Sequence, residues 1–173
     1  MCSGIVHLPI VEMLVWPDES ATQRFAHRLA RLPLLGNAYL ELHGDLGTGK
    51  TTLVRHLLSA LGVTGRIKSP TYAVVEPYEL PTLNIWHFDF YRFNDPHEWE
   101  DAGFRDIFAS PGLKVAEWPE KAAGSVPQAD LVFHLSLAIH ESRLVTLQAY
   151  TAVGEGLMKD LCAEPVSQPE VAE

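Results

Sequence analysis

The stretch GDLGTGKT, residues 44–51, decides the fold of this chain because it fits the phosphate-binding pattern G-x-x-x-x-G-K-[ST]. The preceding residues 38–43, AYLELH, alternate apolar and polar side chains as a half-buried strand does. The following residues 52–58, TLVRHLL, open a helix with an apolar stripe. A strand, a glycine-rich loop and a helix in this order are what a P-loop requires. The sequence therefore predicts an α/β fold that binds a nucleoside triphosphate.

The residue types inside this loop suit phosphate chemistry. Its glycines let the backbone approach phosphate oxygens, where a β-carbon would clash. Backbone N–H groups at the positive end of the following helix would then face the anion. Lys50 is placed to reach the β and γ phosphates, and the hydroxyl of Thr51 is placed to bind Mg²⁺. A glycine-rich turn without a ligand is the alternative, but it explains neither the lysine nor the hydroxyl.

Length and composition indicate one globular domain in a reducing compartment, so we expect a cytoplasmic protein with no membrane association. The 173 residues include no apolar run near the roughly 18 needed to cross a bilayer, and the N-terminus has no signal-peptide pattern. Cys2 and Cys162 lack CxxC spacing, which argues against a disulfide framework or a zinc site. The eight histidines lack ligand spacing and are interpreted as structural or surface residues. A net charge of −9 argues against nucleic-acid binding without a partner.

Periodicity along the chain predicts a mixed β-sheet flanked by helices. The last two strands are expected to be antiparallel, and Ser20 is expected to be the N-cap of the first helix, with Gln23 completing a capping box. Predicted strands are residues 11–16, 38–43, 73–75, 83–91, 115–117, 130–139 and 143–150. Predicted helices run from Ser20 to Pro33, from the P-loop to Gly62, from Asp95 to about Gly103, and over residues 154–162.

Two carboxylates lie at the ends of predicted strands and could complete a nucleotide site. Asp89 ends one strand and Glu117 ends another, and strand carboxyl ends converge in an open α/β sheet. Either could hold Mg²⁺ and its waters, and the sequence does not divide their roles. Thr71, in a Ser-Pro-Thr-Tyr loop, is a candidate switch residue that senses the γ-phosphate. Trp118 could stack on the base, although a core or interface tryptophan is an equal alternative.

Five sequence blocks together resemble the TsaE (YjeE) family over about residues 18–155. The blocks are GDLGTGKTT, SPTYAVVEPYE, HFDFYR, DPHEWEDAGFRD and VAEWPEKA, in this order. The resemblance implies a bacterial P-loop ATPase required for making threonylcarbamoyladenosine on tRNA. It also implies one P-loop ATPase domain over residues 1–162, and residues 163–173 are predicted to be a disordered acidic tail.

The resemblance also implies roles for individual residues. Thr51 and Glu117 would hold Mg²⁺ with Asp89 as the Walker-B-like acid, and Thr71 and Trp118 match the switch-like loop and the tryptophan near the base. Lys50, Asp89, Glu117 and Thr71 would serve catalysis. ATP would contact Thr22, Gly44, Asp45, Leu46, Gly47, Thr48, Gly49, Lys50, Thr51, Thr52, Trp118 and, through a gapped alignment, Arg143.

The implied function is that of an accessory ATPase. Members of this family act with the TsaD–TsaB pair, so we expect TsaD-like and TsaB-like partners and contact with tRNA only through them. ATP binding and hydrolysis would reset that assembly between turnovers. A small-molecule kinase is an alternative, but no arginine-rich lid stands out. A GTPase would need a guanine-reading N/T-K-x-D motif, which the sequence lacks. A nucleotide-gated scaffold without significant hydrolysis also stays open.

Overall fold

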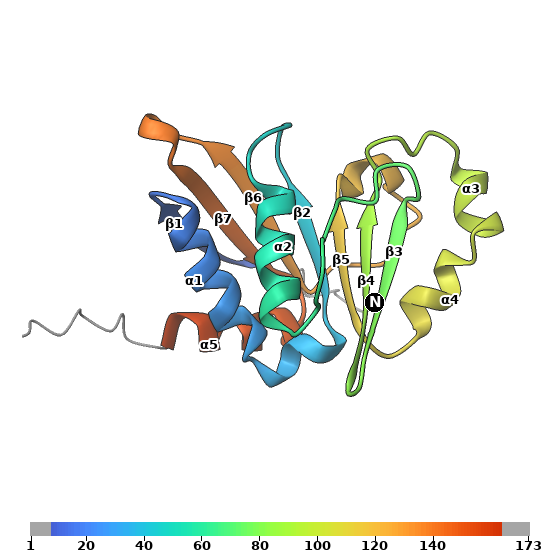
Figure 1. The fold of residues 1–173 in the computed structure, drawn as a ribbon, viewed down its shortest axis with the longest axis horizontal. Helices are drawn as coiled ribbons and strands as arrows, with labels where there is room; N and C mark the ends of the chain where they lie inside the picture. The colour runs from blue at the N-terminus through green and yellow to red at the C-terminus, as the bar shows by residue number, and fades with distance from the viewer. Residues whose placement is uncertain (1–7, 164–173) are drawn as a thin grey trace, which may run out of the picture.

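The computed structural model describes residues 8–163, whose strands form one seven-stranded sheet (Figure 1). The strands are β1 (Ile10–Trp16), β2 (Tyr39–His43), β3 (Val75–Leu80), β4 (Leu83–Asp89), β5 (Leu113–Glu117), β6 (Leu131–Leu137) and β7 (Arg143–Ala149). The α-helices are α1 (Glu19–Ala30), α2 (Lys50–Ala60), α3 (Pro96–Asp101), α4 (Phe104–Ala109) and α5 (Ala152–Ala163). Short 3₁₀ turns are η1 (Pro33–Asn37), η2 (Pro119–Ala122) and η3 (Ile139–Glu141).

The sheet is mixed, as predicted, and its parallel part lies in the centre. The strand order is β1-β7-β6-β2-β5-β4-β3. Strands β6, β2, β5 and β4 run parallel, whereas β3, β7 and β1 join antiparallel at the two edges. In register, Glu117 of β5 lies opposite Leu42 of β2 on one side and Asp89 of β4 on the other. The carboxyl ends of the three central strands therefore meet beside the loop that follows β2.

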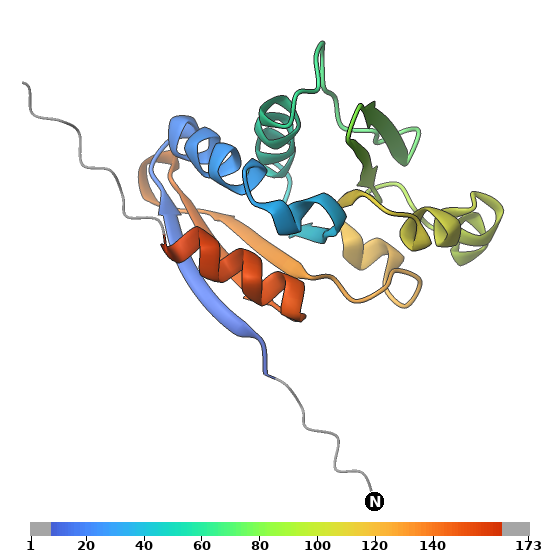
Figure 2. The ribbon, with the colours of Figure 1, turned by 90° about the horizontal axis from the view of Figure 1, so that it is seen from below.

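Two apolar cores hold this sheet in place. Helices α1 and α2 lie side by side over the sheet, and their buried side chains include Phe25, Leu29, Leu53 and Leu57 (Figures 1 and 2). Helix α5 packs against β6, β7 and η1. A smaller, aromatic core joins β4 to α3 and α4, where the Phe88 ring meets the Phe104 ring edge to face at 5.4 Å. The P-loop strand thus stands between two packed layers.

The first helix begins earlier than the capping pattern predicted, so the prediction of Ser20 as N-cap is wrong. Asp18 is the N-cap, and its side chain accepts a hydrogen bond from the backbone N–H of Ala21 at 2.9 Å. The Ser20 hydroxyl donates to the same carboxylate at 2.7 Å. Aspartate satisfies a free N–H and also carries the negative charge that a helix N-terminus favours.

One other prediction fails in the middle of the chain, and one helix there has no predicted counterpart. Residues 73 and 74 form a turn instead of a strand, because Val74 has a left-handed backbone with φ 67°; β3 starts at Val75 and continues through Pro77. A proline is compatible with that position because β3 is an edge strand. The sequence reading also assigned no element to α4. The remaining predicted strands and helices are confirmed within a few residues.

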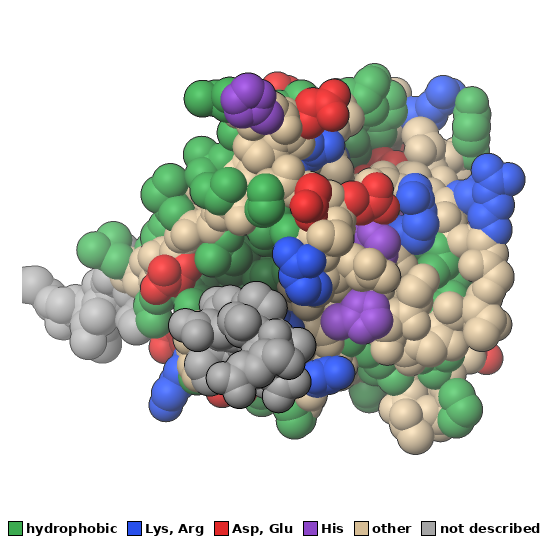
Figure 3. Space-filling view, turned by 60° about the vertical axis from the view of Figure 1, so that its left-hand side comes forward, with side chains coloured by type: hydrophobic (Ala, Val, Ile, Leu, Met, Phe, Trp, Pro, Cys, Tyr) green, Lys and Arg blue, Asp and Glu red, His purple; other side chains and the backbone are tan. Residues whose placement is uncertain are grey.

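Surface character differs between regions of the described chain. In the space-filling view, hydrophobic side chains gather toward the left and charged ones toward the middle and right (Figure 3). The edge strand β1 exposes Val11, Met13 and Val15.

Within residues 8–163, none of the helices has the length and apolar character needed to span a bilayer. The predicted acidic tail lies outside the described residues except for Ala163, which ends α5.

Candidate functional site

The P-loop joins β2 to α2 and depends on glycine at two positions. Gly44 has φ 145°, and a β-carbon there would lie 2.4 Å from the carbonyl oxygen of Leu135, so no larger residue fits. Gly49 has φ 102° and forms the left-handed N-cap of α2. The hydroxyl of Thr48 donates to the carbonyl oxygen of Asp45 at 2.9 Å and closes the loop on itself. The loop therefore has the tight backbone that the sequence motif predicts.

Lys50, at the start of α2, lies under this loop and is only 4% exposed. Its ammonium donates to the carbonyl oxygens of Gly44 and Asp45, at 2.8 Å for Asp45, and lies 4.2 Å from the centroid of a Trp118 ring. Burial lowers the pKa of this lysine, while Glu117 and other nearby carboxylates act in the opposite direction. Among the described residues it makes no direct ion pair, so its charge is available to an incoming phosphate.

A chain of buried hydrogen bonds connects α2 to the strand ends. The hydroxyl of Thr51 donates to Oε2 of Glu117 at 2.8 Å, and Oε1 of Glu117 pairs with Nε2 of His87 at 2.8 Å. Glu117 is 2% exposed and His87 is fully buried. Both oxygens of the carboxylate are thus held in a fixed orientation, one by the P-loop helix and one by β4.

The neighbouring carboxylate, Asp89, is tied to the switch-like loop instead. Its Oδ2 accepts hydrogen bonds from the hydroxyls of Ser69 and Thr71, at 3.0 Å for Thr71. Its Oδ1 accepts the backbone N–H of Tyr91 at 2.9 Å. The structure therefore brings Thr71 and Asp89 together, as expected for residues that serve one site, and separates the bonding partners of Asp89 from those of Glu117.

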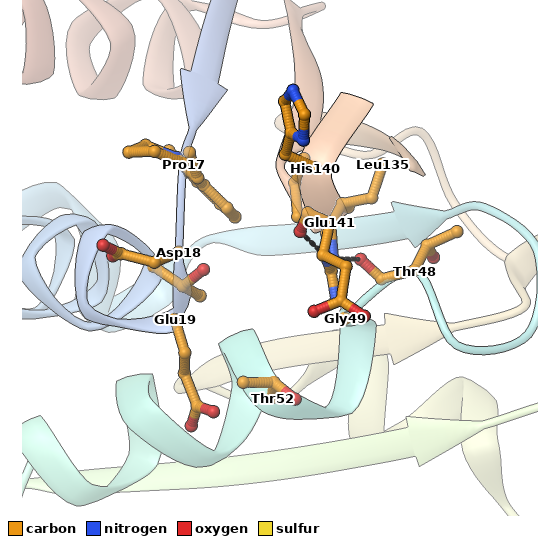
Figure 4. Close-up of a pocket in the computed structure, with 12 residues that line it drawn as sticks. Pro17, Asp18, Glu19, Thr48, Gly49, Thr52, Leu135, His140 and Glu141 are labelled. Carbon is orange, nitrogen blue, oxygen red and sulfur yellow. Dashed lines mark hydrogen bonds between the residues drawn. The ribbon is translucent and has the colours of Figure 1, made fainter. Parts of the chain in front are cut away.

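Two cavities flank the P-loop. The metal-side cavity, about 320 Å³, is lined by Leu46, Gly47, Gly49, Lys50, Thr51, Thr52, Ser69, Thr71, Asp89, Tyr91, Glu117, Trp118 and Arg143. The hairpin-side cavity, about 420 Å³, is lined by Trp16, Pro17, Asp18, Glu19, Thr22, Thr48, Gly49, Thr52, Leu135, His140, Glu141 and Arg143. Figure 4 shows Asp18 and Glu19 on one side of the hairpin-side cavity and His140 and Glu141 on the other. Gly49, Thr52 and Arg143 line both cavities, so the two cavities lie next to each other.

The predicted nucleotide contacts divide between these cavities. Thr22 lies in the hairpin-side cavity, whereas Trp118 lies against Lys50 and Tyr91 in the metal-side cavity, away from Thr22. A stacking role of Trp118 on the base stays a prediction that this placement does not favour. Arg143 begins β7 and donates from Nε to the Thr48 carbonyl oxygen at 2.9 Å. It therefore lies beside the P-loop, where the gapped alignment predicted it.

Sequence reasoning missed several residues of this site. The scattered spacing of the histidines places His87 among the structural ones, although a histidine inside an otherwise apolar strand, two residues before Asp89, indicates a role near that acid. Ser69 and the hairpin residues His140 and Glu141 were also missed. Within residues 8–163, the non-glycine residues with positive φ are Val74, Trp118, His140 and Glu141. All four adjoin the switch-like loop or a cavity, where strained backbone commonly marks function.

The donors in the metal-side cavity fit a hard divalent cation. Two nearly buried carboxylates lie at adjacent strand ends, and side-chain hydroxyls bond to both of them. No group of three or more His, Cys, Asp or Glu within the described chain could hold a metal ion alone. Mg²⁺ takes one or two protein carboxylates and completes its shell with water and phosphate oxygens. The residues present therefore suit Mg²⁺ that arrives with a nucleotide.

The central parallel strands, the glycine-rich loop and the strand-end acids define an α/β protein of the P-loop type. A family model described as threonylcarbamoyl adenosine biosynthesis protein TsaE matches residues 16–145. The chain belongs to the TsaE family, which confirms the resemblance seen in the sequence.

Individual relatives agree with this assignment. The chain is 38% identical over 146 residues to the tRNA threonylcarbamoyladenosine biosynthesis protein TsaE of Haemophilus influenzae, covering 82% of this chain and 92% of that protein. It is 36% identical over 115 residues to the protein of the same name from Bacillus subtilis, covering 66% and 70%. The crystal structure of YdiB from Bacillus subtilis shares the fold, with a TM-score of 0.73, 24% identity and coverage of 90% and 97%.

Proposed function

We propose that this chain is a Mg²⁺-dependent accessory protein that binds and hydrolyses ATP in the biosynthesis of threonylcarbamoyladenosine in tRNA. The observation that carries the proposal is the 2.8 Å hydrogen bond between Thr51 and Glu117. It places the P-loop hydroxyl beside a strand-end carboxylate, and P-loop nucleoside triphosphatases hold Mg²⁺ with such a pair of groups. The relatives named as tRNA threonylcarbamoyladenosine biosynthesis proteins support this pathway.

The two cavities suggest how the nucleotide lies. The phosphates would run over residues 44–52, with the β and γ phosphates near Lys50. The base and ribose would enter the hairpin-side cavity near Thr22, which is buried and lines that cavity together with Thr48 and Thr52. ATP is preferred over GTP in this proposal because the chain has no guanine-reading motif. Arg143 would bridge both parts, since it lines both cavities.

Hydrolysis would proceed by attack of water on the γ-phosphorus and cleavage of its bond to the bridging oxygen, giving ADP, phosphate and a proton. Thr51 and Glu117 would hold Mg²⁺, which neutralises the charge that develops on the phosphates. Asp89 is better placed to orient the water, because it bonds the Thr71 loop and leaves the Thr51 hydroxyl to Glu117. Lys50 would stabilise the same developing charge from the other side.

The effect on tRNA would run through partners. The chain carries a net charge of −9, which disfavours strong binding to nucleic acid by the whole surface. TsaD-like and TsaB-like proteins are the proposed partners in the cytoplasm, and ATP turnover would reset their complex between rounds. The hydroxyl pair of Ser69 and Thr71 on Asp89 offers a direct way for docking at that loop to change hydrolysis.

The test is ATP turnover by the purified chain, alone and with TsaD-like and TsaB-like proteins of the same organism. We expect slow turnover alone, stimulation by the pair, and loss of both in Lys50→Ala. Turnover that the pair does not change would remove the accessory role. Transfer of phosphate to a metabolite instead of water would support the kinase alternative. Nucleotide binding with no phosphate release, with or without the pair, would leave a nucleotide-gated scaffold.

A further inference from the structure

The tip of the hairpin between β6 and β7 forms one wall of the hairpin-side cavity, and its backbone is strained. His140 and Glu141 both have left-handed backbones, with φ 56° and φ 60°. Two successive residues of this kind cost free energy when neither is glycine, and the strain persists only where surrounding contacts hold it. Because such strain is concentrated at functional sites, it indicates a function for this tip.

Hydrogen bonds hold the tip together and tie it to the P-loop. The hydroxyl and the backbone N–H of Ser142 both donate to the carbonyl oxygen of Ile139, at 2.6 Å and 3.2 Å. Arg143 donates from Nη1 to the carbonyl oxygen of Glu141 and from Nε to that of Thr48, at 2.9 Å for Thr48. The backbone of Glu141 is therefore held at a fixed position beside the phosphate-binding loop.

Three carboxylates line the hairpin-side cavity, and they differ in what holds them. Asp18 accepts hydrogen bonds as the N-cap of α1, and Glu19 pairs with His56 at 2.9 Å. Among the described residues, the Glu141 side chain has no hydrogen-bond or ion-pair partner. Figure 4 shows it pointing into the cavity toward Gly49, whereas Asp18 and Glu19 lie on the opposite wall. Glu141 thus offers the cavity a free acceptor next to the P-loop.

The chemistry of a free carboxylate limits which part of a nucleotide it can hold. An ionised carboxylate only accepts hydrogen bonds, and the phosphate oxygens of ATP are acceptors as well, so the two groups repel each other. The donors of ATP are the two hydroxyls of its ribose and the amino group of its base. The ribose is bonded to the α-phosphate and lies next to the P-loop, while the base extends further away. The ribose hydroxyls are therefore the donors nearest to the Glu141 carboxylate.

We propose that Glu141 determines the sugar specificity of the nucleotide site by accepting hydrogen bonds from the 2′- and 3′-hydroxyls of a ribose. This inference rests on the proposed function and narrows its substrate class to nucleotides that carry both hydroxyls. Acidic side chains hold ribose hydroxyls in the same way in dinucleotide-binding folds. Arg143 supports the role, because it fixes the backbone of Glu141 and its positive charge offsets the repulsion between the carboxylate and the phosphates.

The test compares the dissociation constants of ATP and 2′,3′-dideoxy-ATP for the full chain with Mg²⁺, by isothermal titration calorimetry. Glu141→Ala removes the acceptor, and Glu141→Gln keeps one neutral acceptor oxygen. The control is Glu79→Ala, which removes an exposed carboxylate of the far edge strand β3 and changes the net charge equally. We expect wild type and control to bind ATP about tenfold more tightly than dideoxy-ATP, as hydrogen bonds to a charged group would give. In Glu141→Ala this ratio should fall close to unity through loss of ATP affinity, with Glu141→Gln intermediate.

Other outcomes would overturn the inference in distinguishable ways. Equal affinity of the wild type for both nucleotides would mean that the site does not read the ribose, while ATP binding and the proposed function would stand. An equal loss of both nucleotides in Glu141→Ala would indicate that the residue only shapes the hairpin. Tighter binding of both to that variant would mean that the carboxylate repels the phosphates instead of holding the ribose. Failure of the wild type to bind either nucleotide would overturn the proposed function as well.

Discussion

The two cavities beside the P-loop differ in how their polar side chains are held. On the metal side, Glu117 and Asp89 each bond to hydroxyls of neighbouring elements. On the hairpin side, Asp18 and Arg143 are also held by hydrogen bonds, but the side chains of Thr22, Thr52 and His140 make none to other described residues. Charge that develops in a reaction is stabilised best by groups fixed in advance, whereas a base can be bound by shape. The difference predicts large effects of substitutions on the metal side and modest effects on the hairpin side.

Glu117→Gln should give the largest effect. The substitution keeps the shape of the side chain but removes the charge that Thr51 and Lys50 face. We expect ATP turnover, with the partner pair present, to fall about 100-fold or more, as when a group that stabilises developing charge is lost. Turnover is measured as phosphate release at saturating ATP. Glu120→Gln is the control, since that nearby carboxylate is half-exposed and pairs with His43 instead. A similar loss in both variants would contradict the assignment.

His87 should matter almost as much, although it would touch no ligand. It holds Oε1 of Glu117, and its other ring nitrogen is buried with no partner among the described residues. His87→Leu should weaken the apparent affinity for Mg²⁺ about 10- to 100-fold, as loss of a group that orients a metal ligand does. His87→Gln retains a donor at a similar position and should restore much of it. The apparent Mg²⁺ constant for nucleotide binding is measured in both, and equal defects would indicate only a packing role.

Substitution on the hairpin side should have a smaller effect. Thr22→Val preserves the volume in the hairpin-side cavity and removes one hydroxyl. We expect ATP affinity to fall about five- to tenfold, about the worth of one hydrogen bond, with the Mg²⁺ dependence unchanged. Titration with ATP and with ADP measures this. A change in the Mg²⁺ dependence would mean that the two cavities do not act separately.

The smallest predicted effect concerns the pH dependence of stability. Burial lowers the pKa of Lys50 from its usual 10.5, so the unfolded chain keeps this proton to higher pH than the folded chain. Stability therefore rises as pH increases from the folded pKa toward 10.5. Over this pH range, the free energy of unfolding of the wild type should increase relative to that of Lys50→Met. Lys159→Met replaces an exposed lysine of α5 and should show no such difference. If the free energy of unfolding of the wild type fell relative to that of Lys50→Met as the pH rises, the assignment would be contradicted.

The sequence predicted those parts of the structure that depend on local pattern. The P-loop motif, the strands beside it and the two strand-end acids follow from residue type and spacing, and the register places Asp89 beside Glu117 as expected. The strained turn at Val74 and the N-cap at Asp18 depend on tertiary packing and on competition between caps. A histidine inside an apolar strand marks His87, but its partner Glu117 is 30 residues away in sequence, so no local pattern identifies the pairing.

We propose that Glu117 and Thr51 make nucleotide binding depend on Mg²⁺. The most direct measurement is the dissociation constant of ATP, with Mg²⁺ and with a chelator, for wild type, Glu117→Gln and the control Glu120→Gln. We expect Mg²⁺ to tighten ATP binding to the wild type and the control by the same factor and to leave binding to Glu117→Gln unchanged. An equal gain from Mg²⁺ in all three proteins would contradict it.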